Sequence, residues 1–163
     1  MINIIKFPFL YFFRGASYRT KMHIYLICFF RRKRMPRLAS FVANRLQKIQ
    51  GVFISPKACF DTTLSLRHPV GVVVGDGVKL GRNVVIYQQV TLGGARLGDA
   101  KANNYPEIGE NTVIFAGAVV VGKVVIGSNC TIGANSVVTS DVPDGCIAVG
   151  APARIIKSMT YDQ

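Results

Sequence analysis

Aliphatic residues recur at every sixth position along the second half of the chain. The series consists of Ile108, Ile114, Val120, Ile126, Ile132 and Val138. A period of six fits neither an α-helix, which repeats about every 3.6 residues, nor a simply alternating strand. It predicts a chain that turns a corner at each repeat and returns above itself after three sides. Each aliphatic residue then points inward and stacks on its equivalent one coil away.

The same frame extends toward the N-terminus with two interruptions. The upstream positions are Val74, Leu80, Ile86 and Leu92, followed further upstream by Ile54, Phe60 and Leu66 in a frame shifted by two positions. The shift falls directly after His68, and a longer break lies between Leu92 and Ile108. Insertions in a solenoid form loops on one face, so we expect residues 93–107 to be an inserted loop.

Small residues and asparagines mark the predicted corners. Four places after successive aliphatic positions come Thr112, Ala118, Val124, Cys130 and Ser136, and the asparagines at or next to corners are Asn83, Asn111, Asn129 and Asn135. Asn and Gly tolerate the positive φ that a tight corner requires. The body is therefore predicted to be a solenoid of about four coils.

The N-terminal segment at 1–50 lacks this period and predicts two helices. Ser17 or Thr20 is expected to cap a helix that runs to about Arg34, and Pro36 is expected to start a second one. The second helix has Leu38, Phe41, Val42, Leu46 and Ile49 at helical spacing, with Arg37, Arg45 and Lys48 exposed. The sequence thus predicts a helical segment over residues 1–50, a solenoid over residues 51–157 and a tail over residues 158–163.

Composition separates the helical segment from the body. The chain has 163 residues, of which 50% are hydrophobic and 17% charged, which excludes wholesale disorder. Residues 1–50 hold eleven of the 20 basic residues and none of the eight acidic ones, so most of the net charge of +12 lies there. The rest of the chain is nearly neutral, and the overall charge says little about its chemistry.

Two interpretations of the basic segment stay open. Phe29 and Phe30 beside a run of four basic residues at 31–34 suit an anionic membrane surface or a lipid-linked substrate. A plain helical cap over the open end of the solenoid is the alternative. Nucleic-acid binding is disfavoured, because the aromatic residues cluster instead of alternating with basic ones.

The longest apolar runs near the front are residues 7–13 and 22–30, shorter than the roughly 20 residues that span a bilayer. The expected location is therefore the cytoplasm, with a peripheral position at the inner face of the cell membrane as the extension of the first interpretation.

The four cysteines, Cys28, Cys59, Cys130 and Cys146, show no C-x-x-C pair and no histidine at metal-ligand spacing. They are interpreted as small apolar residues, and no metal site is expected. His23 has no motif around it, and a structural role is expected for it.

Several motifs in the body resemble the hexapeptide-repeat acyltransferases, and within them the serine acetyltransferase branch. The stretches that carry the resemblance are His68-Pro69-Val70-Gly71-Val72-Val73-Val74-Gly75, Thr91-Leu92-Gly93-Gly94 and Gly150-Ala151-Pro152-Ala153-Arg154. The resemblance covers about residues 50–157. It implies a mainly β fold, a left-handed parallel β-helix with a short N-terminal helical segment, and a homotrimer with active sites between subunits. It also implies acetyl-CoA as the donor in an O-acetyl transfer.

Transfer of an acetyl group to a hydroxyl requires a base that takes the hydroxyl proton. His68 lies where the repeat breaks, so its side chain can face a cleft, and an imidazole suits proton transfer near neutral pH. The resemblance implies the same role for it. A surface or capping histidine is the alternative.

The donor would be held by residues that the resemblance implies. Gly93 and Gly94 let backbone N–H groups approach it, Arg154 and Lys157 suit its phosphates, and Thr139, Ser140, Ala116 and Ala134 match family positions along its groove.

The chain departs from the serine branch at the acceptor site. Phe53 stands where the branch has the aspartate that pairs with its base, and Arg67 stands where it has the aspartate directly before the base. The loop's usual Arg-His pair is Asn104 and Tyr105. The expected substrate-binding residues are Arg67, Asn104 and Tyr105. With Phe53 in place of the aspartate, another group must orient His68, and the candidates left open are a backbone carbonyl and Asp61.

Free serine is a zwitterion, and these changes remove one anion and one cation from its site. They favour a sugar hydroxyl as acceptor, as in the O-acetyltransferases of capsule, exopolysaccharide and lipopolysaccharide synthesis. L-Serine is the alternative acceptor, and an inactive solenoid that serves as a binding or assembly module is a second alternative.

Overall fold

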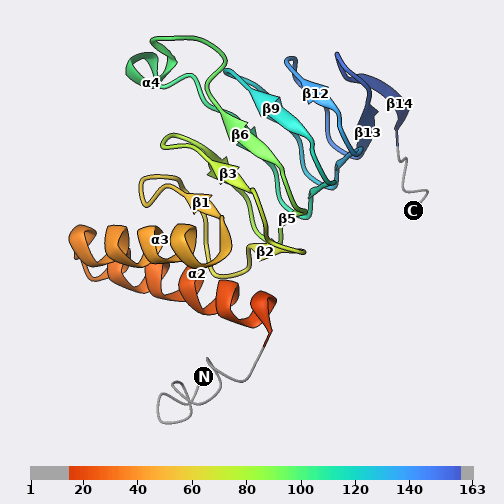
Figure 1. The fold of residues 1–163 in the computed structure, drawn as a ribbon. Coiled ribbons are helices and arrows are strands. Elements are labelled where there is room, and N and C mark those ends of the chain that lie inside the picture. Colours follow the sequence, from red (N-terminus) through yellow and green to blue (C-terminus); the bar gives the residue numbers. More distant parts are fainter. Residues whose placement is uncertain (1–14, 159–163) are drawn as a thin grey trace.

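The computed structural model describes residues 15–158, in which two long helices precede a β-helix (Figure 1). The apolar run at residues 7–13 and all but the first residue of the predicted tail at 158–163 lie outside the described residues. For Ala16, Lys157 and Ser158 the backbone alone is described.

The two helices are α2 (Ala16–Arg32) and α3 (Pro36–Gln50). The start of α2 differs from the prediction, because its N-cap is Gly15 and no side chain caps it. Thr20 is instead buried, and its hydroxyl donates a hydrogen bond to the side-chain oxygen of Gln50 on α3. The predicted end at Arg34 is slightly too late, since Arg34 takes φ 55° in the connecting turn.

The buried face of α3 is rotated from the predicted one. Ala39, Val42, Ala43 and Leu46 are buried, while Leu38, Phe41 and Ile49 are exposed. Both the buried set and the exposed set of residues have helical spacing. The small side chains of the alanines let α3 approach its neighbours closely. The hydrophobic spacing alone could not choose between the two faces.

His23 has the structural role expected for it. It is buried in α2, and its Nδ1 lies 2.7 Å from the carbonyl oxygen of Arg19. Burial lowers the pKa of His23, because the imidazolium would lose its hydration inside the helix pair.

No helix within residues 15–158 is both long and apolar enough to cross a membrane. The outer surface of the helix pair exposes Phe29, Phe41 and Arg32. Contact of this segment with a membrane surface stays a prediction.

The β-helix has three flat faces made of short strands. Face 1 contains β1 (Phe53–Ile54), β3 (Val73–Val74), β6 (Thr91–Gly93), β9 (Val119–Val121) and β12 (Val137–Val138). Face 2 contains β4 (Lys79–Leu80), β7 (Glu107–Ile108) and β10 (Val125–Ile126). Face 3 contains β2 (Ser65–Leu66), β5 (Val85–Ile86), β8 (Val113–Ile114), β11 (Thr131–Ile132), β13 (Cys146–Val149) and β14 (Arg154–Ser158). The chain runs from face 1 to face 2 to face 3, and we name the turns between them the 1–2, 2–3 and 3–1 corners.

The strand register locates the interruptions that the sequence predicted. Val73 pairs with Thr91, and Val119 with Val137, so one complete coil equals three of the sequence repeats. The partner of Phe53 is Val73, two positions beyond the regular one, because the chain is lengthened at the corner that holds His68. Thr91 pairs with Val119 across the inserted loop. The mainly β, left-handed parallel β-helix with a short N-terminal helical segment is confirmed.

Asparagines take the positive φ angles at the corners, as predicted. Asn83, Asn111, Asn129 and Asn135 have φ between 56° and 57°. The neighbouring glycines have a different role, which is close approach between coils. A Cβ added to Gly109 would lie 2.4 Å from the backbone of Gly127, a distance that a real side chain does not reach.

The predicted inward positions form the core. Val74, Leu80, Ile86, Leu92, Ile108, Ile114, Val120, Ile126, Ile132 and Val138 are all buried. The small corner residues Thr112, Ala118, Val124, Cys130 and Ser136 are buried as well. Three cysteines behave as the small apolar residues expected, whereas Cys59 is exposed.

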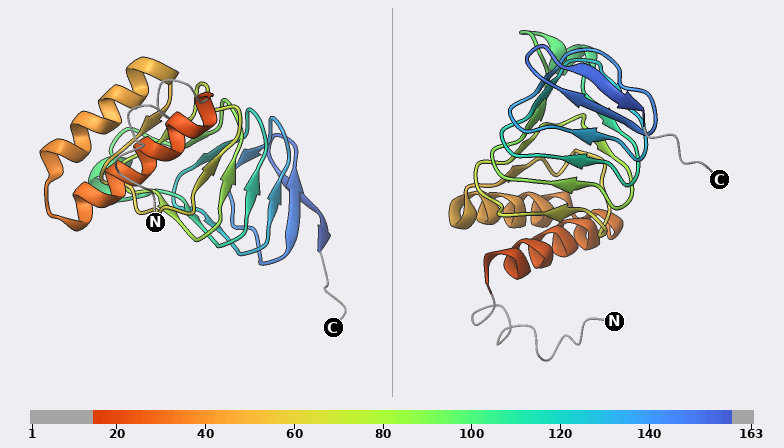
Figure 2. Two further views of the ribbon diagram at one scale, coloured as in Figure 1. Left: turned by 90° about the horizontal axis from the view of Figure 1, so that it is seen from below. Right: turned by 90° about the vertical axis from the view of Figure 1, so that its right-hand side faces the viewer.

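Both ends of the solenoid are covered. Helix α3 contacts β1 at the first coil, and β14 turns back to pair antiparallel with β13 at the last (Figure 2). Ile126 is also bridged to Val142, two positions before its regular partner, so the last coil is shorter than the others.

Neighbouring residues of β10 provide a test of the stacking. Ile126 is 1% exposed and points into the core, while Val125 is 50% exposed on face 2. Ile126→Ala should lower the free energy of unfolding by about 2–5 kcal/mol through lost burial and a cavity. Val125→Ala should change it by less than about 0.5 kcal/mol. Urea denaturation of both variants measures this, and equal losses would contradict the inward stacking.

Candidate functional site

The predicted base lies on the 3–1 corner. His68 is exposed, and its φ of 50° turns the backbone outward where the chain is lengthened. Its ring faces that of Tyr87, with centroids 6.4 Å apart, and Tyr87 stacks on Phe115 at 4.9 Å. The imidazole therefore lies beside an aromatic row that follows the same corner from coil to coil.

Neither expected partner of His68 is found in the part of the chain that the structure describes. The carboxylate of Asp61 accepts hydrogen bonds from the N–H and hydroxyl of Thr63, within its own turn. No described backbone carbonyl hydrogen-bonds the imidazole either. Phe53, which stands at the family's aspartate position, is a half-buried residue of face 1. Within residues 15–158, the aromatic neighbour of the imidazole is Tyr87.

Arg67 precedes His68 and is exposed. Its backbone N–H donates to the carbonyl oxygen of Ile86, which fixes the chain at the end of β2. Arg67 thus adds an exposed basic residue directly before His68 on this corner.

The inserted loop leaves from the 1–2 corner and contains the short helix α4 (Asp99–Ala102). One carboxylate organises it: Asp99 Oδ2 accepts the N–H groups of Ala95 and Arg96, and Oδ1 accepts the side-chain amide of Asn104 at 3.1 Å. These hydrogen bonds, that from Asn104 above all, lower the pKa of Asp99. The amide of Asn104 therefore holds the loop in shape.

The two loop glycines differ in their surroundings. A Cβ on Gly94 would lie 2.9 Å from Cβ of Asp99, so the loop's own packing requires glycine there. A Cβ on Gly93 would meet nothing within 4 Å, which leaves open space beside its backbone.

Tyr105 lies at the same corner, half-buried over the preceding coil. A Cβ on Gly77 would be 2.2 Å from Cδ2 of Tyr105, so the ring occupies the space that glycine leaves. The ring also contacts the position of Gly75, where a Cβ would lie 3.1 Å from Cε1. The ring of Tyr105 thus lies close to the residues on both sides of Asp76.

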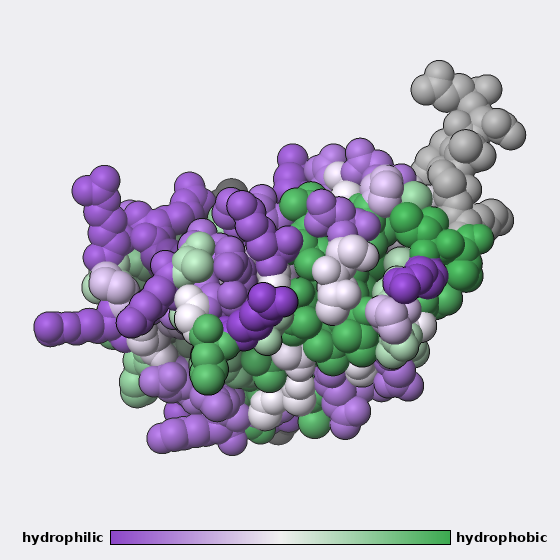
Figure 3. Space-filling model, turned by 90° about the horizontal axis from the view of Figure 1, so that it is seen from above, coloured by the Kyte–Doolittle hydropathy of each residue, from purple (hydrophilic) through white to green (hydrophobic). Residues whose placement is uncertain are grey.

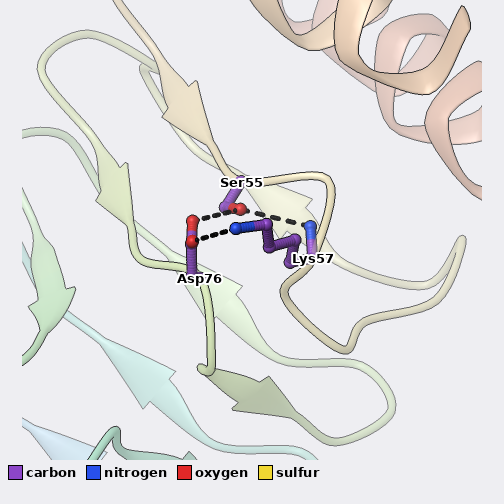
Figure 4. Close-up of polar contacts among 3 residues, drawn as sticks. All are labelled: Ser55, Lys57 and Asp76. Atoms are coloured by element: carbon purple, nitrogen blue, oxygen red, sulfur yellow. Dashed lines mark hydrogen bonds and ion pairs between the residues drawn. The ribbon is translucent and has the colours of Figure 1, made fainter. Parts of the chain in front are cut away.

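Asp76 belongs to a polar cluster that sequence reasoning missed (Figure 4). The buried Ser55 donates its hydroxyl to Asp76 Oδ1 at 2.7 Å, and Lys57 Nζ lies 2.8 Å from Oδ2. The hydrogen bonds from Lys57 and then Ser55 lower the pKa of Asp76, and the pairing with Asp76 raises that of Lys57. The frame shift in the sequence after His68 could have revealed this cluster. It implies that the first coil is two residues longer than a regular coil, and this lengthening places Ser55 beside Gly75.

The cluster lines a cavity of about 640 Å³. Arg31 of α2, Arg34 of the turn between α2 and α3, and Phe53 of β1 line the same cavity. This cavity therefore lies between the helix pair and the first coil, at the 1–2 corner.

The residues expected to hold the donor lie in three places. Ala116 and Ala134 lie on the 3–1 corner, in the two coils that follow Tyr87. Thr139 lines a cavity of about 320 Å³ under the inserted loop, together with Asn104 and with Lys123, a cation that sequence reasoning missed.

The remaining donor residues lie at the end of the solenoid. Ser140 and Arg154 line a smaller cavity of about 160 Å³. Arg154 donates from Nη1 to the carbonyl of Ala153, and Lys157 belongs to β14 opposite Ile147.

Apart from Arg154 and Lys157, which belong to β14 of face 3, the predicted residues lie at two edges of face 1. His68, Arg67, Ala116 and Ala134 are at the 3–1 corner, and Gly93, Gly94, Asn104, Tyr105, Thr139 and Ser140 are at the 1–2 corner. Figure 1 shows the loop with α4 and the turn after β2 at opposite ends of the face-1 strands. One copy of the chain does not bring the two groups together. No cluster of three potential metal ligands occurs within residues 15–158.

Comparison with known families supports the repeat. Residues 105–140 match the model "Bacterial transferase hexapeptide (six repeats)", and residues 68–88 match "Hexapeptide repeat of succinyl-transferase".

The similar curated sequences are serine acetyltransferases. That of Staphylococcus xylosus is 42% identical over 120 residues, which is 74% of this chain and 55% of the relative. That of Staphylococcus aureus strain Mu50 is 46% identical over 107 residues, 66% of this chain and 49% of the relative. The chain spans about half the length of these relatives.

Solved structures agree. The serine acetyltransferase of Neisseria gonorrhoeae superposes with a TM-score of 0.79 at 35% identity, covering 93% of this chain and 59% of that one. A serine acetyltransferase in complex with CoA gives 0.76 at 30% identity, covering 88% and 58%.

These comparisons contradict the prediction of a sugar acceptor from polysaccharide synthesis. The relatives are serine acetyltransferases, and no closeness to polysaccharide O-acetyltransferases is shown. The prediction rested on the charges lost at Arg67 and Asn104. It took no account of charges that the fold brings to the 1–2 corner from elsewhere, such as Lys57 and Asp76.

Asp76 gives a pH-dependent test of the polar cluster. Its pKa is lower in the folded chain than in the unfolded one, so its stabilising effect is complete above the ordinary aspartate pKa and disappears as the pH falls through the lowered value. Asp76→Asn should lower the free energy of unfolding by up to about 1 kcal/mol near pH 7.

The difference between wild type and Asp76→Asn should shrink when urea denaturation is repeated at about pH 3. Glu107→Gln, which breaks the exposed pair of Lys79 and Glu107, is the matched control and should have a smaller effect. An Asp76→Asn difference that is the same at both pH values would contradict the assignment.

Proposed function

The chain belongs to the hexapeptide-repeat acetyltransferase family, and we propose that it transfers the acetyl group of acetyl-CoA to the hydroxyl of L-serine. The observation that carries the proposal is the exposed imidazole of His68 at the break in the repeat, within a span that is 42% identical to a serine acetyltransferase.

His68 acts as the general base. An imidazole nitrogen accepts the proton of the serine hydroxyl while the hydroxyl oxygen forms its bond to the acetyl carbon. The carbon–sulfur bond breaks in the same transfer, and the proton is passed on to the leaving thiolate. Tyr87, which stacks on Phe115, lies beside the imidazole on one side.

The residues present fit acetyl-CoA, which supplies the activated acetyl group as a thioester. Arg154 and Lys123 bring cationic groups to cavities that Ser140 and Thr139 also line, as phosphate binding requires. The open space beside Gly93 gives access to a backbone N–H. In a serine acetyltransferase of similar fold, CoA is the bound ligand.

The active site is shared between copies of the chain in a homotrimer. The support is the separation of the predicted residues onto two edges of face 1, since a neighbouring copy can place its 1–2 corner against the 3–1 corner of the first. Contacts of this head-to-tail kind close into a ring when each copy uses both edges.

The outward side chains distinguish the faces. On faces 1 and 3 they include Phe53, Val73, Val119, Val85 and Val113, whereas on face 2 they are Val125 and the ion pair of Lys79 and Glu107. Figure 3 shows apolar side chains gathered over the later coils and hydrophilic ones toward the helices and the inserted loop. Apolar faces suit burial between copies, and a charged face suits water.

Replacement of His68 tests the reaction. His68→Ala should lower kcat about 10²- to 10⁴-fold while the circular dichroism spectrum stays unchanged, because the residue is exposed and outside the core. Thiol release from acetyl-CoA is measured with L-serine and with L-alanine, which lacks the hydroxyl. Thiol release by the wild type that is no faster with L-serine than with L-alanine would refute the function, and near-normal activity of His68→Ala would refute the role of the base.

The proposed trimer can be tested by introducing a charge at two exposed valines, one on face 1 and one on face 2, and measuring the mass of the assembly. Light scattering of the wild type should give about three times the mass of one chain. Val73→Lys on face 1 should lower this mass by burying an unpaired charge between copies, and Val125→Lys on face 2 should leave it unchanged. A trimeric Val73→Lys variant would exclude face 1 from the contact.

A further inference from the structure

Two ion pairs occur among the described residues, and they differ in construction. Lys79 and Glu107 are register partners on adjacent strands of face 2, and among the described residues the hydrogen bond at 2.6 Å between their side chains has no further side-chain partner. Lys57 and Asp76 lie at the 1–2 corner, and there Asp76 is also held by the buried hydroxyl of Ser55. A buried anchor of this kind fixes the position of the carboxylate, which an isolated surface pair does not require.

The cluster keeps hydrogen-bonding capacity for a ligand. The side chains of Lys57 and Asp76 are 76% and 45% exposed. An ammonium has three donors, of which one is used here, and a carboxylate accepts about four hydrogen bonds, of which two are used. Both groups are charged at neutral pH, because the pairing raises the pKa of Lys57 and lowers that of Asp76.

The surroundings give the cluster the form of a small-molecule site. Ser55, Lys57 and Asp76 line the cavity of about 640 Å³, and Phe53 adds an apolar surface to its lining. Beside the cluster, the half-buried ring of Tyr105 fills the space above Gly77. A fixed anion, an adjacent cation and a phenol therefore meet at one corner.

This combination matches a zwitterion. L-Serine has a carboxylate and an ammonium group on one carbon atom, and removing either from water without a partner is costly. A preformed pair of opposite charges provides both partners in one place. Arg67 beside His68 provides a cation but no anion.

We propose that Lys57 and Asp76 of one copy bind the carboxylate and the ammonium of L-serine and present its hydroxyl to His68 of the neighbouring copy. The inference rests on the proposed function and names the residues that select the acceptor. Within one chain β3 separates the cluster at the 1–2 corner from His68 at the 3–1 corner, so the partner copy completes the site.

Kinetics of Lys57→Met provide the first test. The loss of a charged hydrogen bond should raise KM for L-serine about 10- to 100-fold, with KM for acetyl-CoA unchanged. Lys57→Arg should recover most of the loss. L-Serinamide, which lacks the carboxylate, should be used poorly by the wild type, and the preference for L-serine over L-serinamide should fall at least about tenfold in Lys57→Met.

The matched control is Lys79→Met, which removes the lysine of the other ion pair. It should leave unchanged KM for L-serine, KM for acetyl-CoA and the preference for L-serine over L-serinamide. Thiol release without an L-serine dependence in the wild type would overturn the proposed function. An active wild type together with an unchanged KM for L-serine in Lys57→Met would overturn this inference alone.

Mixed oligomers test the sharing between copies. His68→Ala and Lys57→Met subunits, mixed in equal amounts, unfolded and refolded together, should form sites with both wild-type residues at about a quarter of the contacts. At low L-serine the mixture should therefore regain about a quarter of the wild-type rate, well above the mean of the two parents. A rate equal to that mean would show that both residues act in one copy and would overturn the shared site.

Discussion

The stacking of regular coils is the constraint on which the rest of the structure depends. Each coil hydrogen-bonds to the next along three faces, and its inward aliphatic residues are buried against those above and below. A residue added within a strand would reverse the side chains that follow it. Extra residues therefore enter at corners, a short stretch at His68 and a longer one at the inserted loop, and both places carry the candidate chemistry.

The repeat could be predicted from the sequence because it depends on local spacing. Ile114 and Ile132 belong to one continuous series, and the register that pairs them follows from the same period. The buried face of α3 could not be predicted, because Leu38 and Phe41 have the same helical spacing as Ala39 and Val42. The choice depended on packing against α2 and β1, which spacing does not encode.

The candidate site was predictable where a motif marked it, and less so elsewhere. His68 was identified from the break in the repeat and its neighbouring motif. Lys57 and Asp76 belong to no motif, and their contact arises from the lengthened first coil that brings separate turns together. Judging the acceptor from Arg67 and Asn104 alone therefore led to the sugar prediction that the relatives contradict.

The covered ends of the solenoid also limit how the protein can associate. A parallel stack of coils leaves a row of unpaired backbone groups at each end, on which another chain could build without limit. Helix α3 lies against β1 at one end, and the antiparallel β14, with an irregular register beside Ile147, closes the other. These elements hinder growth into fibres along the solenoid axis, and in the proposed trimer the copies meet through the faces instead, where a closed ring has a definite number of copies.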